Sequence, residues 1–195
     1  MVAFIGLTGG IGAGKSTALE ALERLGAPTL STDAVVHDLY GSPRVRDAVV
    51  ARLGRSVLRD DAIDRAAVAA RAFATPADRA WLEGLLWPLV TERMAAWRAQ
   101  VETASPPPRA AFVEVPLLFE SGMESAFDAT IAIVADEAVR ARRAGARGHQ
   151  ALVERSARQL SQQEKAQRAT YRVVNDGTVE QLETQLSAVL EMLPG

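Results

Sequence analysis

Residues 9–16 read Gly-Gly-Ile-Gly-Ala-Gly-Lys-Ser and match the phosphate-loop pattern Gly-x-x-x-x-Gly-Lys-Ser in full. The short apolar run Val2–Leu7 precedes this stretch, and a helical pattern over Thr17–Leu25 follows it. Glycines let the backbone turn tightly, so that several N–H groups point into one nest, and the helix start adds the positive end of its dipole. A chance match is the alternative, with odds on the order of one in a hundred. The motif in this setting therefore predicts a site for the phosphates of a nucleotide.

Each residue of this loop has an expected task at the nucleotide. The ammonium of Lys15 reaches the β- and γ-phosphates, and the hydroxyl of Ser16 ligates Mg²⁺. Backbone groups supply the remaining phosphate contacts. The predicted nucleotide-binding residues of the loop are Gly10, Ile11, Gly12, Ala13, Gly14, Lys15, Ser16 and Thr17. A nucleoside triphosphate and Mg²⁺ are therefore the expected cofactors.

The hydrophobic pattern along the rest of the chain predicts a parallel α/β sheet, because short apolar runs alternate with helical stretches. The five predicted strands are Val2–Leu7, Pro28–Thr32, Ala110–Val115, Ala129–Ala135 and Tyr171–Val174. Helices are predicted over Asp136–Arg143 and Gln150–Ala169, and Thr178 is expected to cap a last helix that ends near Leu193. The expected fold is of the P-loop NTPase type, with helices flanking a five-stranded sheet.

The middle of the chain differs from this pattern. Residues 44–102 are rich in Ala and Arg and have helical periodicity, with an apolar stripe between Leu82 and Leu89. The breaks that divide this stretch into about three helices fall at residues 41–43, 59–61 and 75–76. The predicted organisation is thus one domain over residues 1–195 with a helical insertion at about 44–102.

Composition limits the classes of function. The chain has 195 residues, a formal net charge of −2 and no cysteine, so neither a general basic field nor thiol chemistry is expected. The first residues lack the basic and long apolar regions of a signal peptide, and no run approaches the ~18–20 apolar residues of a membrane helix. We therefore expect a cytoplasmic monomer that acts on small molecules and has no nucleic-acid or membrane partner.

The loop alone leaves open a GTPase switch, a motor ATPase and a small kinase. A guanine-reading Asn-Lys-x-Asp segment is missing from the sequence, and motor or transporter ATPases are normally longer. A small kinase needs a carboxylate near the acceptor hydroxyl, arginines around the transferred phosphoryl group and an element that excludes water. The sequence offers candidates for all three.

Asp33 and an arginine-rich stretch are these candidates. Asp33 follows the second predicted strand, at the edge where open α/β sheets bind ligands, and its carboxylate can take the proton of an attacking hydroxyl. Its alternative role is the N-cap of a helix over Ala34–Leu39. The arginines of the stretch are Arg140, Arg142, Arg143, Arg147, Arg155 and Arg158. These arginines are the expected phosphate-binding residues of a lid at about residues 140–165. The alternative interpretation is that they form the solvated face of a helix.

Beyond the loop, several segments resemble the dephospho-CoA kinase family. The opening Ile5–Thr17 is similar to the family's signature almost residue for residue, and Val115-Pro-Leu-Leu-Phe-Glu120 resembles its Pro-Leu-Leu-Phe-Glu motif. Val174-Asn-Asp-Gly177 is similar to the segment before the last helix, and Leu86-Trp-Pro-Leu-Val90 to the helical CoA-side region. The likeness covers nearly the whole chain, and other small kinases share the loop but not the Val115–Glu120 block.

The resemblance implies a reaction and roles for single residues. ATP would phosphorylate the ribose 3′-hydroxyl of dephospho-CoA, giving CoA and ADP. Asp33 matches the family's catalytic base, and Asn175 matches the position beside the adenine. Arg142 most nearly matches the lid arginine that meets the phosphates, with Arg140 or Arg147 as alternatives. The catalytic residues that the resemblance implies are Asp33, Lys15 and Arg142.

The chain also departs from the family's pattern. Ser31-Thr-Asp33 stands where many relatives have Asp-Ala-Asp, His37 stands where an arginine is usual, and Trp87 stands where a histidine is frequent. We expect His37 to be a polar helix residue rather than a substrate contact. Glu114, which ends the third strand, is a candidate ligand for a Mg²⁺-bound water, and Glu120 is expected to anchor its loop through hydrogen bonds.

Overall fold

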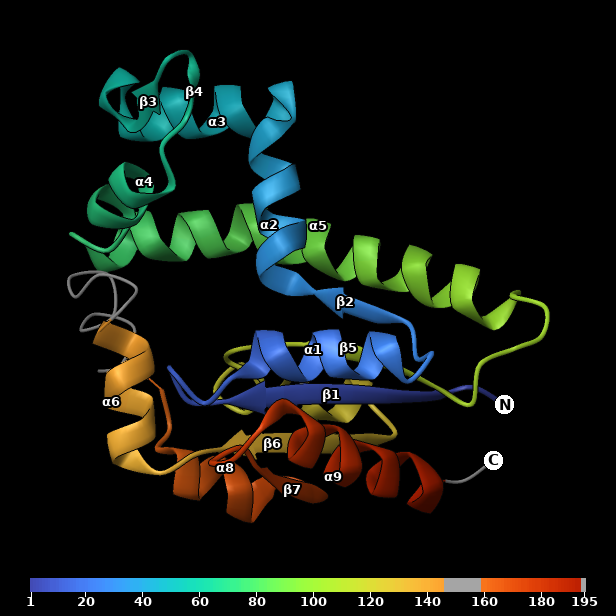
Figure 1. The fold of residues 1–195 in the computed structure, drawn as a ribbon. Helices are drawn as coiled ribbons and strands as arrows, with labels where there is room; N and C mark the ends of the chain where they lie inside the picture. The colour runs from blue at the N-terminus through green and yellow to red at the C-terminus, as the bar shows by residue number, and fades with distance from the viewer. Residues whose placement is uncertain (146–158, 194–195) are drawn as a thin grey trace. The chain divides into compact units, whose positions relative to one another are not determined.

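The computed structural model describes residues 1–145 and 159–193, which belong to two compact units (Figure 1). The first unit comprises Met1–Ser31 and Arg98–Gly195, and the second comprises Thr32–Trp97. The second unit thus begins earlier in the chain than the insertion expected at 44–102. The expected lid at about 140–165 lies partly outside the described residues.

The first unit is built on a five-stranded sheet whose strands all run parallel, which confirms the predicted architecture. The strands are β1 (Ala3–Gly9), β2 (Thr29–Ser31), β5 (Ala110–Glu114), β6 (Ala129–Val134) and β7 (Tyr171–Val174). Their order across the sheet is β2-β5-β1-β6-β7, so that β1 lies in the middle. Because the strands are parallel, the loops that follow β1 and β5 leave the sheet side by side at its carboxyl edge.

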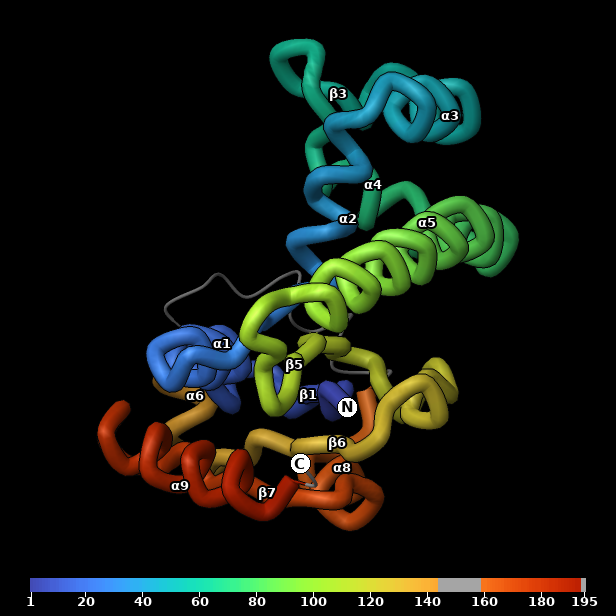
Figure 2. The backbone as a smooth tube through the Cα atoms, turned by 90° about the vertical axis from the view of Figure 1, so that its right-hand side faces the viewer, coloured from blue at the N-terminus to red at the C-terminus, as the bar shows by residue number. Residues whose placement is uncertain are grey.

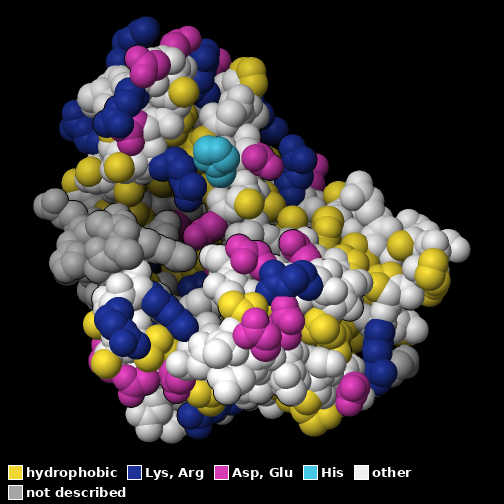
Figure 3. All heavy atoms as spheres, viewed as in Figure 1, with side chains coloured by type: hydrophobic (Ala, Val, Ile, Leu, Met, Phe, Trp, Pro, Cys, Tyr) yellow, Lys and Arg dark blue, Asp and Glu magenta, His cyan; other side chains and the backbone are white. Residues whose placement is uncertain are grey.

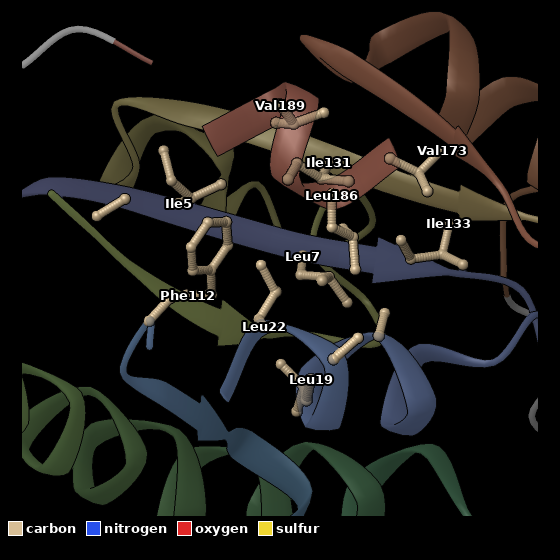
Figure 4. Packing of buried hydrophobic residues seen from close by; sticks show 14 of the residues in the cluster. Ile5, Leu7, Leu19, Leu22, Phe112, Ile131, Ile133, Val173, Leu186 and Val189 are labelled. Atoms are coloured by element: carbon tan, nitrogen blue, oxygen red, sulfur yellow. The ribbon is translucent and has the colours of Figure 1, made fainter. Parts of the chain in front are cut away.

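Strand β1 is buried on both faces because helices cover both sides of the sheet. Ile5 and Leu7 point to the face covered by α1 (Lys15–Arg24) and α9 (Val179–Met192), where the main core forms (Figure 4). Other members of this core are Leu19, Leu22, Phe112, Ile131, Ile133, Val173, Leu186 and Val189. Burial of these side chains fixes β1, and with it the start of the phosphate loop.

The opposite face of the sheet carries the remaining contacts of β1. Figure 2 shows α8 (Gln162–Arg168) on the other side of the strands from α1 and α9. On this face the ring of Phe127 stacks on Phe4 with 5.3 Å between ring centroids. The guanidinium of Arg98, near the end of α5 (Pro76–Glu102), lies 4.7 Å from the Phe4 ring centroid. An aromatic pair and a cation–π contact therefore stabilise the packing at the amino end of β1.

The second unit is mainly helical and keeps the predicted breaks. Its helices are α2 (Thr32–Gly41), α3 (Pro43–Leu53), α4 (Arg65–Ala72), the larger part of α5 and the short 3₁₀ turn Arg55–Val57. The side chain of Ser42 accepts the backbone N–H of Val45, and Pro43 occupies the first helical position of α3. The break at residues 41–43 is thus a helix cap followed by a proline at the position that tolerates it.

A small hairpin in the second unit is not predicted by the sequence pattern. Strands β3 (Leu58–Arg59) and β4 (Ala62–Ile63) pair antiparallel across the expected break at 59–61. Asp60 and Asp61 form the turn with φ of 51° and 61°. A two-residue hairpin turn needs this left-handed conformation, which Asp tolerates better than most side chains.

The carboxyl-terminal helices follow the sequence prediction in part. Thr178 accepts the N–H of Gln181, whose side chain in turn accepts the N–H of Thr178, so that the predicted cap of α9 is confirmed as a capping box. Of the helix expected over Gln150–Ala169, the described residues contain α8 only. Ser161 caps α8 and ends helical continuity on its amino-terminal side.

The surface carries charges of both signs. On the face in Figure 3, basic and acidic side chains are interspersed over the described residues, as the net charge of −2 suggests. None of the helices in the described part of the chain is both long and apolar enough to cross a bilayer.

Candidate functional site

The phosphate loop connects β1 to α1 through two glycines in the left-handed region. Gly12 has φ of 76° and Gly14 has φ of 91°, and Lys15 begins α1 immediately afterwards. A Cβ on Gly14 would lie 2.1 Å from Nδ2 of Asn175, and a Cβ on Gly12 would lie 2.7 Å from the carbonyl oxygen of Arg140. These glycines are therefore needed both for the turn and for the close approach of neighbouring segments.

The Lys15 side chain folds over the loop that carries it. Its Nζ donates hydrogen bonds to the carbonyl oxygens of Gly9 at 3.1 Å and Gly10 at 3.4 Å. Ser16 is exposed in the first turn of α1, where the helix dipole favours a negative ligand. A cation, a hydroxyl and a helix start thus converge at one edge of the sheet, as the motif predicts.

Helix α6 (Glu137–Gly145) lies against this loop. The Nε of Arg140 donates to the carbonyl oxygen of Ile11 at 2.9 Å, and its NH1 forms an ion pair with Glu137 at 2.7 Å. NH1 of Arg143 donates to the carbonyl oxygen of Asn175 at 3.0 Å. The loop, α6 and residues 159–163 border a pocket of about 320 Å³. The site therefore has arginine side chains beside the place where phosphates are expected.

The structure brings Arg140 and Arg143 to the loop and to Asn175. Residues three apart share one face of a helix, so Arg140 and Arg143 project to the same side of α6. The Arg142 side chain is exposed. The other predicted lid arginines, Arg147, Arg155 and Arg158, lie outside the described residues.

Replacing Arg140 by Met is expected to raise the KM for ATP or lower kcat by about tenfold, the worth of one hydrogen bond to a charged group. Arg142→Met is the matched comparison, because it removes the same charge from an exposed position of the same helix. Its kinetic constants are expected to stay within about twofold of wild type, measured by coupled ADP release. A larger loss for Arg142→Met than for Arg140→Met would instead support Arg142 as the arginine that meets the phosphates, as the family resemblance implies.

Asn175 supports the phosphate loop through a hydrogen bond of its buried side chain. It is 4% exposed, its Nδ2 donates to the carbonyl oxygen of Ala13 at 2.9 Å, and its N–H donates to the carbonyl oxygen of Val134 at 2.8 Å. The side-chain amide of Gln185 on α9 holds the preceding residue: it accepts from the N–H of Val174 at 3.0 Å and donates to its carbonyl oxygen at 2.7 Å. Asn175 thus carries a structural contact to the loop, and its place beside an adenine stays a prediction.

Two acidic residues lie at the same edge of the sheet, one as the last residue of β5 and one in the turn after it. Glu114, 7% exposed, accepts a hydrogen bond from Oγ of Ser31 at 2.9 Å, and these two residues are also partners in the pairing of β2 with β5. Glu120 accepts the N–H of Leu160 at 2.8 Å and forms an ion pair with Lys165 at 2.9 Å. Glu120 therefore anchors its loop by hydrogen bonds, as expected from the sequence.

Sequence reasoning missed Lys165, which is 0% exposed on α8. Its Nζ donates to the carbonyl oxygen of Pro116 at 2.6 Å and to Oγ1 of Thr8 at 3.4 Å, besides its ion pair with Glu120. Burial lowers the pKa of the Lys165 ammonium, and the hydrogen bond and charge of Glu120 oppose that shift. One signal in the composition points to it: of the 22 basic residues, Lys15 and Lys165 are the two lysines.

Comparisons with known proteins agree with this geometry. The family model for dephospho-CoA kinase matches residues 3–181. A dephospho-CoA kinase from Deinococcus radiodurans is 39% identical over 97% of this chain and 91% of its own length. The solved structure of TT1252 from Thermus thermophilus superposes with a TM-score of 0.83 at 32% identity, covering 100% of this chain and 99% of its own. Dephospho-CoA kinase from Campylobacter jejuni, with a TM-score of 0.69, 23% identity and coverage of 98% and 96%, shares the fold. The chain belongs to the dephospho-CoA kinase family.

Proposed function

We propose that this chain transfers the γ-phosphoryl group of ATP to the ribose 3′-hydroxyl of dephospho-CoA, giving CoA and ADP, the last step of CoA synthesis. One observation carries the proposal: the family match over residues 3–181 includes both the phosphate loop and the Val115–Glu120 segment. The first holds a phosphate donor, and the second follows the neighbouring strand of the same sheet. Donor and acceptor groups can therefore meet at one edge of the sheet.

The loop residues fit ATP with Mg²⁺. Mg²⁺ in such sites is held by phosphate oxygens, waters and one or two protein oxygens, which suits the exposed hydroxyl of Ser16 at the start of α1. Over residues 1–145 and 159–193 no group of three acidic or histidine side chains forms a metal cluster of its own. When bound, the ion neutralises charge on the β- and γ-phosphates. Glu114, at the end of β5, is the proposed acceptor for a water of that ion.

Asp33 is the proposed general base. It is the second residue of α2, the helix that follows β2, and comes two residues after the end of that strand. Its carboxylate takes the proton of the acceptor hydroxyl as that oxygen attacks the γ-phosphorus and ADP leaves. The alternative role as the N-cap of a helix over Ala34–Leu39 does not hold, because α2 begins at Thr32 and Asp33 lies in its first turn. The remaining structural alternative is that its carboxylate only interacts favourably with the helix dipole. Kinetics of an Asp33 variant separate the two roles.

We further propose that the protein acts as a monomer in the cytoplasm. The absence of cysteine and the mixed surface charge suit a small-molecule enzyme in a reducing compartment. Size-exclusion chromatography with light scattering checks the monomer, for which a mass near 20.8 kDa is expected.

An acceptor panel tests the reaction. With ATP and Mg²⁺, ADP is expected to form at least on the order of 10²-fold faster with dephospho-CoA than with CMP, UMP or AMP. The reason is that smaller acceptors cannot make all the hydrogen bonds that the site offers to dephospho-CoA. Omission of Mg²⁺ is expected to abolish turnover. Mass spectrometry should find one added phosphoryl group on the acceptor. Faster turnover of a nucleoside monophosphate would indicate a different small kinase, and tight ATP binding without acceptor-dependent ADP would indicate a regulator.

A further inference from the structure

A lysine ammonium is buried in the first unit at a junction of three chain segments. Lys165, on α8, contacts Thr8 near the end of β1 and both Pro116 and Glu120 in the turn after β5. Oγ1 of Thr8 also donates to the carbonyl oxygen of Pro116 at 3.3 Å, and Glu120 also holds the backbone of Leu160. The ammonium thus connects the strand that carries the phosphate loop with the turn on the neighbouring strand.

We propose that Lys165 is a positioning residue for phosphoryl transfer, which keeps the phosphate loop and the Pro116–Glu120 turn in fixed register at the carboxyl edge of the sheet. The inference rests on the proposed kinase reaction. Lys165 touches neither phosphate-loop residues nor Asp33 through any contact seen among the described residues, so it acts through the segments that it holds.

The position of these contacts makes them relevant to the reaction. Thr8 comes immediately before Gly9, whose carbonyl oxygen accepts a hydrogen bond from Lys15. Pro116 comes two residues after Glu114, which pairs with the end of β2. A shift at either contact therefore moves a loop at the reacting edge, and a misplacement of about 1 Å can cost about 10²-fold in rate.

The chemistry of the cluster requires a lysine. A buried cation must be fully compensated, and this ammonium has one carboxylate and two neutral oxygens as partners within 3.4 Å. An ammonium is compact and directs its donors to three separate oxygens, one on β1 and two in the turn after β5, whereas a guanidinium is planar and larger. This chain uses arginine for all its basic residues except Lys15 and Lys165. The presence of lysine at these two positions is consistent with sites that fit a compact ammonium and not a planar guanidinium.

Steady-state kinetics of three variants test the inference, each at a temperature well below its own Tm. Lys165→Met is expected to lower kcat by about ten- to a hundredfold while the KM values for ATP and dephospho-CoA stay within about threefold, because alignment rather than binding is lost. Lys165→Arg is expected to lower kcat in the same way, although this variant keeps the positive charge. Arg168→Met is the matched control on the same helix. Its side chain is exposed and, among the described residues, makes no hydrogen bond or ion pair with Thr8, Pro116 or Glu120, so kcat should remain within about twofold.

Two further variants keep the test decisive if Lys165→Met does not fold. Thr8→Val removes one acceptor of the ammonium, and Glu120→Gln removes the charge of its carboxylate partner. Both variants are expected to lower kcat in the same direction by a smaller factor. Unchanged kcat in the folded variants, with only a lower Tm, would overturn the positioning role. A wild-type protein without dephospho-CoA turnover would instead overturn the proposed function, so the two failures are distinguishable.

Discussion

Replacing Asp33 by Asn is expected to lower kcat by about 10²–10⁴-fold, the usual contribution of a general base, while ATP binding stays nearly unchanged. The amide keeps the size of the side chain and its capacity to accept a hydrogen bond, but it cannot take the proton of the acceptor hydroxyl. Turnover with dephospho-CoA measures the first effect, and calorimetric titration with a non-hydrolysable ATP analogue measures the second.

The matched control is Asp38→Asn, which makes the same change at an exposed position of the same helix. It is expected to leave kcat within about twofold. If Asp33→Asn keeps full turnover and only loses thermal stability, its carboxylate serves the first turn of α2 and another group is the base.

Lys15→Ala is expected to weaken nucleotide binding and also to lower kcat by about 10²–10³-fold, since the ammonium stabilises charge on the phosphates in both ground and transition state. The structure adds a second reason for the loss. Nζ of Lys15 donates to the carbonyl oxygens of Gly9 and Gly10, so its removal also loosens the loop. The ATP dissociation constant and kcat measured on the same preparation separate the two effects.

Arg24→Ala provides the control for that variant. Arg24 is the last residue of α1, the helix that Lys15 begins, and it pairs with Glu183 on α9. Loss of this exposed pair is expected to leave ATP affinity and kcat within about twofold, because surface ion pairs contribute little. If Lys15→Ala binds and turns over ATP like this control, the loop does not hold the phosphate donor.

The sheet could be predicted because its strands are short, apolar and buried on both faces, so that local hydrophobic runs mark them. The phosphate loop could be predicted because glycine spacing and one lysine define it locally. The hairpin at Asp60 and Asp61 could not, since its strands are two residues long and have no periodicity to detect. Local sequence thus indicates elements that are long or chemically constrained.

Contacts at the site between residues far apart in the chain could not be predicted from the sequence. Asn175 meets Ala13 across 162 positions, and Lys165 meets Thr8 across 157. The choice between Arg140 and Arg142 depends on the rotation of α6 against the loop, which composition does not set. The residue types of the site could therefore be predicted from the sequence, whereas the contacts that these residues make could be identified only in the folded structure.

The contact between Gln185 and Val174 also affects how the molecule meets its neighbours. β7 is an edge strand, and such strands offer unpaired N–H and C=O groups to any passing chain. The amide of Gln185 occupies both backbone groups of Val174, the last residue of that strand. To pair with Val174, an incoming strand would have to displace the Gln185 side chain, so this contact hinders strand addition at the carboxyl end of β7.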